Sequence, residues 1–334
     1  MRHVVKIGES VPLIGHIAFG IIDRGTNLLQ VRPTSLCPLS CIFCSVDAGP
    51  ASRRRTSDFV VDVDHLIRWF QMVVRLKRIE RAHAYIDAAG DPLTYPRLVE
   101  LVSRLKKLRC VDTVALETHG ALLTMEMAEK LDDAGLDRIN LSLDALNPKL
   151  AKTLAGSEWF DVGKVLEVAE YIATSLRMDL LIAPVWIPSI NTEEIPRIIE
   201  FALRIGAGKR WPPLGIQKYE AHKYGRKPRG VRPMRWRDFY VKLRSWESEY
   251  GVKLILKPED FGIRKANKLP LKFKRLERVS VRLVAKGLFR GQWLGVARNR
   301  VVTIVGLEEG VTPARRVTVR MLRVKNNIYI AEVC

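Results

Sequence analysis

The sequence predicts an α/β fold made of repeated strand and helix units, followed by a small all-β barrel. Residues 25–220 alternate short β-branched or apolar runs with longer stretches of helical periodicity, which is typical of βα units around a parallel sheet. Residues 277–334 alternate with period two and are punctuated by glycine, which favours about five short strands. The 334 residues, 47% of them hydrophobic, suffice for one large barrel with an appendage or for two domains.

The α/β part is expected to contain six strands joined by amphipathic helices. The strands are expected at NLLQVRPT (27–34), AHAYIDAAG (82–90), TVALETHG (113–120), RINLSLDA (138–145), MDLLIAPVWI (178–187) and PLGIQKYE (213–220). The helices are expected at 62–78, 96–108, 124–134, 162–176 and 193–205. Thr124 and either Asn191 or Thr192 are expected to cap helices, because their side-chain oxygens can accept hydrogen bonds from the first turn. The loops after the strands are where βα barrels hold reactive groups.

The chain changes character after residue 220. Residues 222–244, which we call the basic arm, hold nine Lys and Arg against one Asp, and prolines make their first half a poor helix. A helix is expected over 235–250 and a strand at GVKLILKP (251–258). We therefore expect a domain of residues 1–258 with a short N-terminal extension and the basic arm, a basic linker of residues 259–276, and a β-barrel of residues 277–334.

The positive charge is concentrated in the last part of the chain. The formal net charge is +20; residues 1–200 carry 24 Lys and Arg against 26 Asp and Glu, and residues 201–334 carry 32 against 10. Such a surface attracts polyanions, above all nucleic acid, through counterion release. The alternative is a heat-adapted or highly soluble protein, in which acidic residues would be expected to balance the basic ones locally.

No run of the sequence approaches the ~20 apolar residues of a membrane span, and MRHVVKIGES lacks the features of a signal peptide. We expect a cytoplasmic protein with no membrane partner. The chain has five cysteines, an odd number that does not resemble the paired framework of a secreted disulfide scaffold. A reducing compartment would leave them as thiolate ligands.

Three of the cysteines, Cys37, Cys41 and Cys44, form a C-x3-C-x2-C motif. A structural zinc site would need a fourth ligand, and the nearest histidines, His16 and His65, lie about twenty residues away in sequence. Isolated buried cysteines would not need this spacing. An iron–sulfur cluster bound by three cysteines would keep one iron open for another ligand, which is an arrangement that a reaction site can use.

The motif, with Phe43 as an aromatic residue before its last cysteine and a strand before it, resembles that of the radical S-adenosylmethionine (SAM) superfamily. The resemblance covers about residues 28–220 and implies a partial (β/α)6 TIM-like barrel. It implies that the three cysteines bind a [4Fe-4S] cluster whose open iron is chelated by the amino and carboxylate groups of SAM. An electron, from a donor such as ferredoxin, then cleaves SAM to a 5′-deoxyadenosyl radical, while the protein supplies orientation and exclusion.

Later segments are similar to the SAM-binding stretches of that superfamily. They are AAGDP (88–92), NLSLDALNP (140–148), VWIPSIN (185–191) and GIQKYE (215–220). The resemblance implies that the cofactor-binding residues are Phe43, Gly90, Asp91, Ser142, Asp144, Asn191 and Gln217. Asp91 stands where the family more often has glutamate. From the residues alone, a plain turn at 90–92 and a polar pair inside the barrel at Ser142 and Asp144 stay open as alternatives.

Four residues are candidates for catalysis. ETHG (117–120) stands where the family often has Thr-Asn-Gly, so Glu117 and His119 could serve the substrate, His119 as a proton carrier. An ordinary loop histidine is the alternative. Cys110 and Cys334 are candidates because radical SAM RNA methyltransferases use two further cysteines; a buried Cys110 and an incidental Cys334 are the alternative.

The C-terminal module resembles a TRAM domain, a small β-barrel that is taken to bind RNA. The resemblance rests on GQWLGVARNRVVTIVG (291–306) and RRVTVRMLRVKNNIYIAEV (315–333). Phe289, Trp293 and Tyr329 could stack on unpaired bases or belong to the barrel core. TRAM-bearing methylthiotransferases carry three further cysteines upstream, and none of the 36 residues before Cys37 is cysteine, so that reaction is disfavoured.

Three hypotheses follow for the function. The first is a radical SAM enzyme that modifies a nucleotide in tRNA or rRNA. The second is a small-molecule or peptide-modifying radical SAM enzyme of the cofactor-maturation type. The third is an RNA-binding protein with a structural cluster, which would form no 5′-deoxyadenosine.

Overall fold

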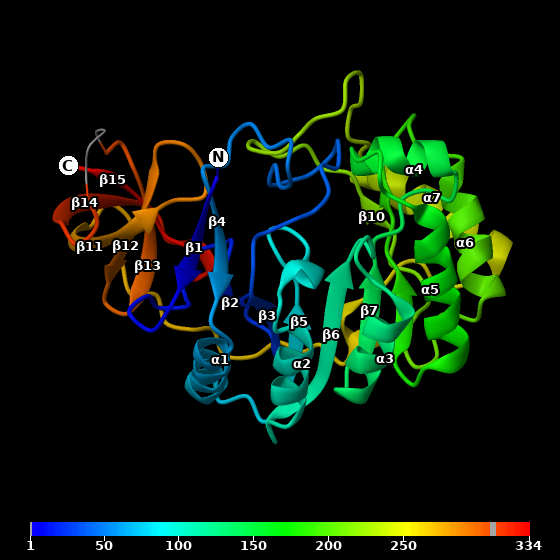
Figure 1. The fold of residues 1–334 in the computed structure, drawn as a ribbon, viewed down its shortest axis with the longest axis horizontal. Coiled ribbons are helices and arrows are strands. Elements are labelled where there is room, and N and C mark those ends of the chain that lie inside the picture. Colours follow the sequence, from blue (N-terminus) through cyan, green and yellow to red (C-terminus); the bar gives the residue numbers. More distant parts are fainter. Residues whose placement is uncertain (1, 308–311) are drawn as a thin grey trace.

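A computed structural model describes residues 2–307 and 312–334 of the chain. Figure 1 shows a small β-barrel on one side of the molecule and a larger sheet with its helices on the other. A two-stranded parallel sheet lies between them; it is formed by β1 (His3–Ile7) and β4 (Ser57–Val61). No helix within the described residues is long and apolar enough to cross a membrane.

The main sheet has six strands in the order β2-β3-β5-β6-β7-β8. They are β2 (Gly20–Asp23), β3 (Leu28–Arg32), β5 (Ala82–Ile86), β6 (Val111–Thr118), β7 (Arg138–Leu141) and β8 (Asp179–Ile182). β2 runs antiparallel to β3, and the other neighbours are parallel. Apolar side chains of these strands, such as Leu29, Val31 and Leu116, are fully buried, which explains the near-continuous hydrophobic runs in the sequence.

Helices connect the parallel strands. They are α1 (Val63–Lys77), α2 (Leu98–Lys106), α3 (Met125–Asp133), α4 (Pro148–Ala155), α5 (Val162–Ser175) and α6 (Glu194–Arg204). The five helices predicted from periodicity are confirmed, and α4 is an addition. Thr124 caps α3 as predicted, because its hydroxyl accepts a hydrogen bond from the Met127 amide. A 3-10 turn, Pro92–Thr94, follows β5.

Five of the six predicted strands lie in the main sheet, but the prediction for the sixth was wrong in extent. Residues 213–220 contain only β10 (Gln217–Lys218), which pairs in parallel with β9 (Val185–Trp186) in a separate sheet. Pro213 has no amide hydrogen to donate, so pairing with β8 is limited to a bridge between Leu214 and Ile182. The sixth strand of the sheet is instead β2, at the other edge.

Two further local predictions were wrong. Neither Asn191 nor Thr192 caps α6, whose N-cap is Glu193 without a side-chain hydrogen bond. No strand forms at 251–258: after α7 (Trp236–Tyr250) the amides of Leu254 and Ile255 both donate to Glu247 at 2.8 Å, and the Pro258–Phe261 turn follows. The apolar pattern predicted that these amides would pair with a neighbouring strand, but the Glu247 carboxylate accepts their hydrogen bonds instead.

The C-terminal module is a closed five-stranded barrel in the order β11-β12-β13-β15-β14, as the period-two pattern predicted. Its strands are β11 (Arg278–Lys286), β12 (Gln292–Ala297), β13 (Arg300–Val305), β14 (Arg316–Arg323) and β15 (Ile330–Val333), with a short turn at Lys325–Asn327. Its core includes Val281, Leu283, Ile304 and Tyr329, so Tyr329 is a core residue and no stacking platform.

The barrel is hydrogen-bonded to the rest of the chain. The Val301 amide donates to the Ile14 carbonyl at 2.8 Å, and the Tyr329 amide donates to Gly15 at 3.1 Å. Residues 259–276 lie against the edge of the main sheet, where the Leu269 amide donates to Asp23 at 2.9 Å. Asp23 is also the partner of the fully buried Lys77. The division of the chain at 259–276 stays a prediction.

Candidate functional site

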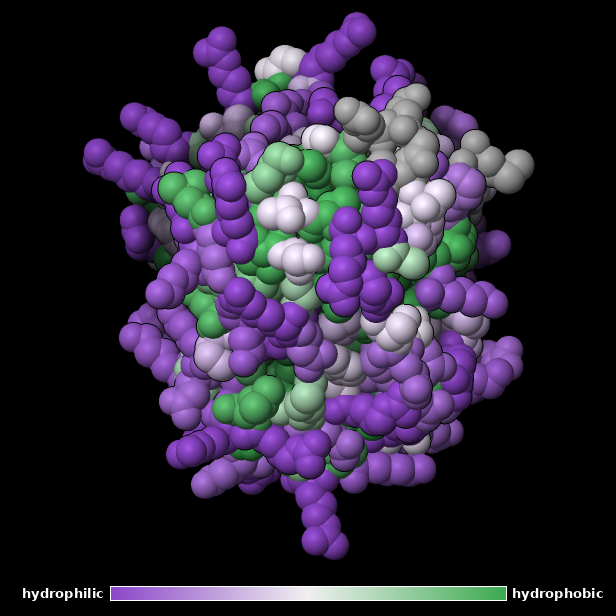
Figure 2. Space-filling model, turned by 90° about the vertical axis from the view of Figure 1, so that its left-hand side faces the viewer, coloured by the Kyte–Doolittle hydropathy of each residue, from purple (hydrophilic) through white to green (hydrophobic). Residues whose placement is uncertain are grey.

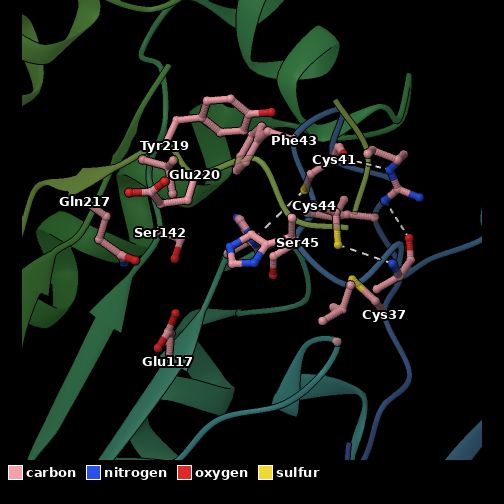
Figure 3. Close-up of a pocket in the computed structure, with 18 of the residues that line it drawn as sticks. Cys37, Cys41, Phe43, Cys44, Ser45, Glu117, Ser142, Gln217, Tyr219 and Glu220 are labelled. Carbon is pink, nitrogen blue, oxygen red and sulfur yellow. Dashed lines mark hydrogen bonds between the residues drawn. The ribbon is translucent and has the colours of Figure 1, made fainter. Parts of the chain in front are cut away.

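A pocket of about 360 Å³ opens at the carboxyl end of the parallel strands. Figure 3 shows the three cysteines on one side of it and Ser142, Gln217 and Glu220 on the other, with Glu117 below Ser142. The full lining is Cys37, Leu39, Cys41, Phe43, Cys44, Ser45, Val46, Ala48, Ala88, Gly90, Glu117, His119, Ser142, Val185, Gln217, Lys218, Tyr219, Glu220, His222 and Arg226. The sequence motif and the loops that follow three different strands therefore meet in one place.

The cysteines lie on the irregular segment between β3 and β4, which we call the cysteine loop (residues 33–56). All three are free thiols; Cys41 is buried, and Cys37 and Cys44 are half-buried. A turn forms where the Cys44 amide donates to the Cys41 carbonyl at 3.1 Å, and the Ala48 amide donates to the Cys44 sulfur at 3.2 Å. Gly49, with φ of 90°, closes the loop: a Cβ there would lie 1.6 Å from the Leu39 carbonyl oxygen.

Two arginines that no sequence motif singled out, Arg55 and Arg226, hold the cysteine loop in shape. Arg55 is buried and donates to the carbonyls of Val46 and Ser35 at 2.9 and 2.8 Å, and to Asp58 at 3.0 Å. Its guanidinium also donates to the Ala89 carbonyl, so it ties the loop to the segment after β5.

Arg226, from the basic arm, approaches from the other side. Its guanidinium donates to the Cys41 carbonyl at 2.7 Å, to the Ala48 carbonyl at 2.6 Å and to Asp47 at 2.8 Å. Its own amide donates to the Cys44 carbonyl at 2.8 Å. These contacts span more than 175 residues of sequence, so no local pattern indicated them.

Gly90 and Asp91 were both predicted to contact the cofactor, but only Gly90 lies at the pocket. Gly90 lines the pocket, and a Cβ there would lie 2.0 Å from the Leu36 carbonyl oxygen, so only glycine allows this close approach next to Cys37. Asp91 is 1% exposed and does not line the pocket. Its carboxylate accepts hydrogen bonds from the Thr118 hydroxyl at 2.9 Å and the His119 amide at 3.1 Å.

Ser142 and Gln217 line the pocket, as does Phe43, whereas Asp144 and Asn191 lie behind it. The Asp144 carboxylate accepts from the Val185 amide at 2.8 Å. Asn191 is fully buried, and its amide group donates to the carbonyls of Asp144 and Val185 at 2.9 Å each. Asp144 and Asn191 thus fix the Val185 segment that forms one wall.

His119 and Glu117 both reach the pocket. His119 lies 4.0 Å from the Cys41 sulfur and 3.8 Å from Asp144. Burial lowers the pKa of His119, but Cys41 and Asp144 outweigh it and hold that pKa well above its usual value. Burial raises the pKa of Glu117, which accepts a hydrogen bond from the Tyr85 hydroxyl.

The structure does not bring Cys110 or Cys334 to the pocket. Cys110 directly precedes β6, at the amino end of the parallel sheet, where its carbonyl accepts from the Ala82 amide. Cys334 follows β15 in the barrel and is exposed. His16 and His65 do not line the pocket either.

One lining residue that the sequence did not single out has an unused polar group. Tyr219 is 2% exposed, and its hydroxyl has no hydrogen-bond partner among the described residues. A buried hydroxyl without a partner is costly, so a ligand in this pocket would gain a ready hydrogen bond. Figure 3 shows the Tyr219 ring beside Phe43, above the cysteines.

The donor set fits an iron–sulfur cluster with an organic ligand. Burial, Asp91 and the neighbouring thiols raise the pKa of Cys37, so thiolates here need cations beside them, which the irons of a cluster supply. Among the described residues, no group of three or more His, Cys, Asp or Glu side chains is arranged so that it could hold a single metal ion. The adjoining walls, with Ser142, Gln217 and the unpaired Tyr219 hydroxyl, offer polar groups to a ligand larger than an ion.

Comparisons with known proteins agree with this geometry. The sequence pattern of the family described as Radical SAM superfamily matches residues 31–202, more than half of the chain. An uncharacterized protein of Methanocaldococcus jannaschii is 40% identical over 99% of this chain and 81% of its own length. A probable GTP 3′,8-cyclase of the same organism is 31% identical over 55% of this chain; the match spans 57% of that relative.

Two solved structures share the fold. Streptococcus suis SuiB bound to S-adenosylmethionine matches with a TM-score of 0.50 at 17% identity, over 68% of this chain and 48% of SuiB. TYW1 with a lysine-pyruvate adduct bound also matches with a TM-score of 0.50 at 17% identity, over 74% of this chain and 81% of TYW1. At this level of identity the likeness concerns the fold alone.

Proposed function

This chain belongs to the radical SAM superfamily, and we propose that it modifies a nucleotide within an RNA, with tRNA or rRNA as the substrate class. The cofactors of this superfamily are a [4Fe-4S] cluster and SAM, which supply a 5′-deoxyadenosyl radical when bound and reduced. Such an enzyme needs an electron donor, and we propose one of the ferredoxin type.

We assign the roles in the pocket as follows. Cys37, Cys41 and Cys44 hold the cluster, and Arg226 and Arg55 keep their loop folded around it. Gly90 lines the pocket, so its backbone can face SAM, and its close packing on Leu36 holds that segment in place. Ser142, Gln217 and Tyr219 offer hydrogen bonds to the rest of the ligand, and Asp91, Asp144 and Asn191 support the walls.

The observation that carries the RNA proposal is an arginine ladder on the outside of the barrel. In the antiparallel pair β11–β14, Arg278 lies opposite Arg320 and Arg282 lies opposite Arg316. Like charges directly opposite each other destabilise a sheet, so a bound anion such as a phosphate would stabilise this arrangement. Among the described residues only Arg320 of the four has a carboxylate partner, Glu332.

The surface around the ladder suits a phosphate backbone. Arg278, Arg282 and Arg316 line a hollow of about 460 Å³ together with Arg298. Figure 2, which looks at the barrel side, shows long hydrophilic side chains projecting over most of this face around a smaller hydrophobic area. We therefore propose that the barrel is a TRAM-type RNA-binding module that tracks phosphates with these arginines.

The barrel is joined to the cysteine loop and to the basic arm, which supports an RNA path from the barrel toward the pocket. The Thr56 amide donates to the Leu288 carbonyl and the Arg290 amide to the Arg54 carbonyl, both at 3.0 Å. Phe289, in the same barrel loop, stacks on Tyr224 of the basic arm with a centroid separation of 4.8 Å.

A second candidate is a free small molecule or a peptide as substrate, in the manner of cofactor-maturation enzymes. Its support is the likeness to the GTP 3′,8-cyclases, which extends over 55% of this chain for the relative from Methanocaldococcus jannaschii. This chain spans about half the length of that relative and of SuiB, so neither name transfers with its substrate.

An RNA-binding assay on the full chain separates the two candidates. We expect the reconstituted protein to bind unmodified tRNA or rRNA with a steep salt dependence. Changing both Arg278 and Arg316 to Ala removes two phosphate contacts and should lower the slope of log K against log salt by about 1.4 to 1.8. The matched control changes Lys107 and Arg109, exposed at the opposite end of the sheet, to Ala and should leave the slope unchanged.

The chemistry is read in the same samples. Incubation with SAM and a reductant should yield 5′-deoxyadenosine and a mass change in one nucleoside of the RNA. No RNA binding at low salt, together with turnover of GTP or a peptide, would establish the second candidate instead. Binding of RNA without any 5′-deoxyadenosine would point to a structural cluster.

A further inference from the structure

The first turns of α7 carry two exposed aromatic rings that already stack on each other. Trp236 is 53% exposed and Tyr240 is 39% exposed. Their centroids are 5.7 Å apart and their planes meet at 26°. The two residues are four apart on the helix, so both rings lie on one helix face and present a joint surface to solvent.

The packing of α7 does not account for these rings. The helix is anchored by its buried residues Phe239, Leu243 and Trp246. Phe239 packs against Trp186 of β9 with a centroid separation of 5.9 Å, and Trp236 meets Phe239 edge-on at 5.8 Å. One side of each ring in this aromatic platform thus packs against Phe239, while about half of Trp236 and more than a third of Tyr240 remain exposed to solvent.

The platform adjoins the rim of the pocket. The Lys218 ammonium lies 4.8 Å from the centroid of the Trp236 ring. Lys218 lines the pocket itself, in an ion pair with Glu220 at 2.7 Å. A group stacked on Trp236 would thus lie next to a residue that lines the pocket.

The charges around the platform select its occupant. Arg237 and Arg244 are exposed on the same helix, and Arg244 lies one turn beyond Tyr240 on the same face. Lys218, on the pocket side, is already paired with Glu220, so the cations available to a ligand are the two arginines. Stacked aromatic rings flanked by cations suit a flat ring attached to a phosphate, which is an unpaired nucleotide, better than an apolar protein face.

We propose that Trp236 and Tyr240 form a stacking platform for an unpaired base of the RNA, next in sequence to the nucleotide that enters the pocket. Arg237 and Arg244 bind the phosphates on either side of that base. The proposal rests on the proposed function. It adds that the substrate nucleotide lies in a single-stranded loop or is flanked by an unstacked base, and that duplex RNA alone is not a substrate.

The test measures affinities of the full reconstituted chain for a short unstructured RNA and for the same RNA annealed to its complement. We expect Trp236→Ala to weaken binding of the unpaired RNA by about tenfold, as loss of one stacked base does, and to leave duplex binding unchanged. Trp236→Phe keeps a ring and should lie within about twofold of the wild type. Trp159→Ala, which removes a 54%-exposed tryptophan on the α4–α5 connection, is the matched control.

Two results would overturn the platform while leaving the RNA proposal intact. One is unchanged binding of unpaired RNA by Trp236→Ala. The other is an equal loss for unpaired and duplex RNA, or an equal loss in Trp159→Ala, which would show a general surface effect. Failure of the wild-type chain to bind either RNA would instead overturn the proposed function and the platform with it; tight capture of a protein partner at Trp236 would then identify another occupant.

Discussion

Replacing Arg226 by alanine should loosen the cysteine loop and lower the amount of iron that the protein binds. Arg226 makes three side-chain hydrogen bonds to the loop, to the carbonyls of Cys41 and Ala48 and to the carboxylate of Asp47. The Asp47 side chain is only 4% exposed, so the substitution leaves a buried carboxylate without its cation.

The size of the effect follows from those contacts. A hydrogen bond to a charged group contributes roughly 1.5–3 kcal/mol. Two features limit the loss: the Arg226 side chain is 20% exposed, and Asp47 still accepts hydrogen bonds from Ser52 and the amides of Arg53 and Arg54. We therefore expect the loop to lose about 3 kcal/mol of stability in all, the upper value for one such bond. That corresponds to a change of roughly 150-fold in the equilibrium between the folded and the locally unfolded cysteine loop.

The assay counts iron and sulfide per chain after anaerobic reconstitution, and follows amide hydrogen exchange over residues 37–48 in the iron-free protein. Arg226→Ala should bind clearly fewer than the four irons of a full cluster and exchange faster in this segment. Arg226→Lys keeps the charge without the forked geometry and should be intermediate. Arg229→Ala, exposed in the same arm, should match the wild type. Full iron loading and unchanged exchange in Arg226→Ala would refute the bracing role.

Three further predictions concern the pocket. Cys41→Ser should abolish cluster binding, whereas Cys110→Ser, at the other end of the sheet, should retain it, as iron analysis and the visible absorption band will show. Tyr219→Phe should weaken SAM binding by roughly fivefold, the effect of one hydrogen bond of about 1 kcal/mol, in calorimetry of the reconstituted protein; equal affinity would mean that the free hydroxyl faces another ligand. Glu117→Gln should stabilise the iron-free protein at neutral pH. Burial raises the pKa of Glu117, so the folded state loses stability as the pH rises above the ordinary Glu value of about 4.3. The stability gained by Glu117→Gln should therefore vanish below that pH, as melting experiments will show.

The sequence predicted the helices and strands whose own residues show a clear pattern of buried and exposed positions. The amphipathic helices and five parallel strands followed from hydrophobic periodicity, and α4 was missed although Asn147 and Pro148 mark its start with an N-cap and a proline in the first turn. The last predicted strand failed because proline chemistry limits its pairing. The cap predicted at Asn191 failed because the same side-chain groups serve equally well in a buried turn, where Asn191 bonds to Asp144 and Val185.

The pocket could be predicted only in part, for a similar reason. The cysteines, Gly90, Ser142 and Gln217 belong to local segments with a recognisable pattern, and the structure brings them to one cavity. Which carboxylates remain free for a ligand depends on neighbours distant in sequence; Asp91, for example, is engaged by Thr118. The role of Arg226 could not be predicted, because an arginine in a basic segment gives the same sequence pattern whether it binds a phosphate or a backbone carbonyl.

The basic arm therefore has two roles that cannot be separated by truncation. Tyr224 stacks on Phe289 of the barrel, and Arg226, two residues later, holds the loop that carries the cluster cysteines. Removing the barrel would take away the partner of Tyr224 and release the Thr56 and Arg54 contacts at the end of the cysteine loop. We therefore expect a shortened chain to lose the cluster together with whatever ligand the barrel binds. Only substitutions at outward-facing positions, such as the arginine ladder and the Trp236 platform, can test the proposed RNA binding without disturbing the cluster site.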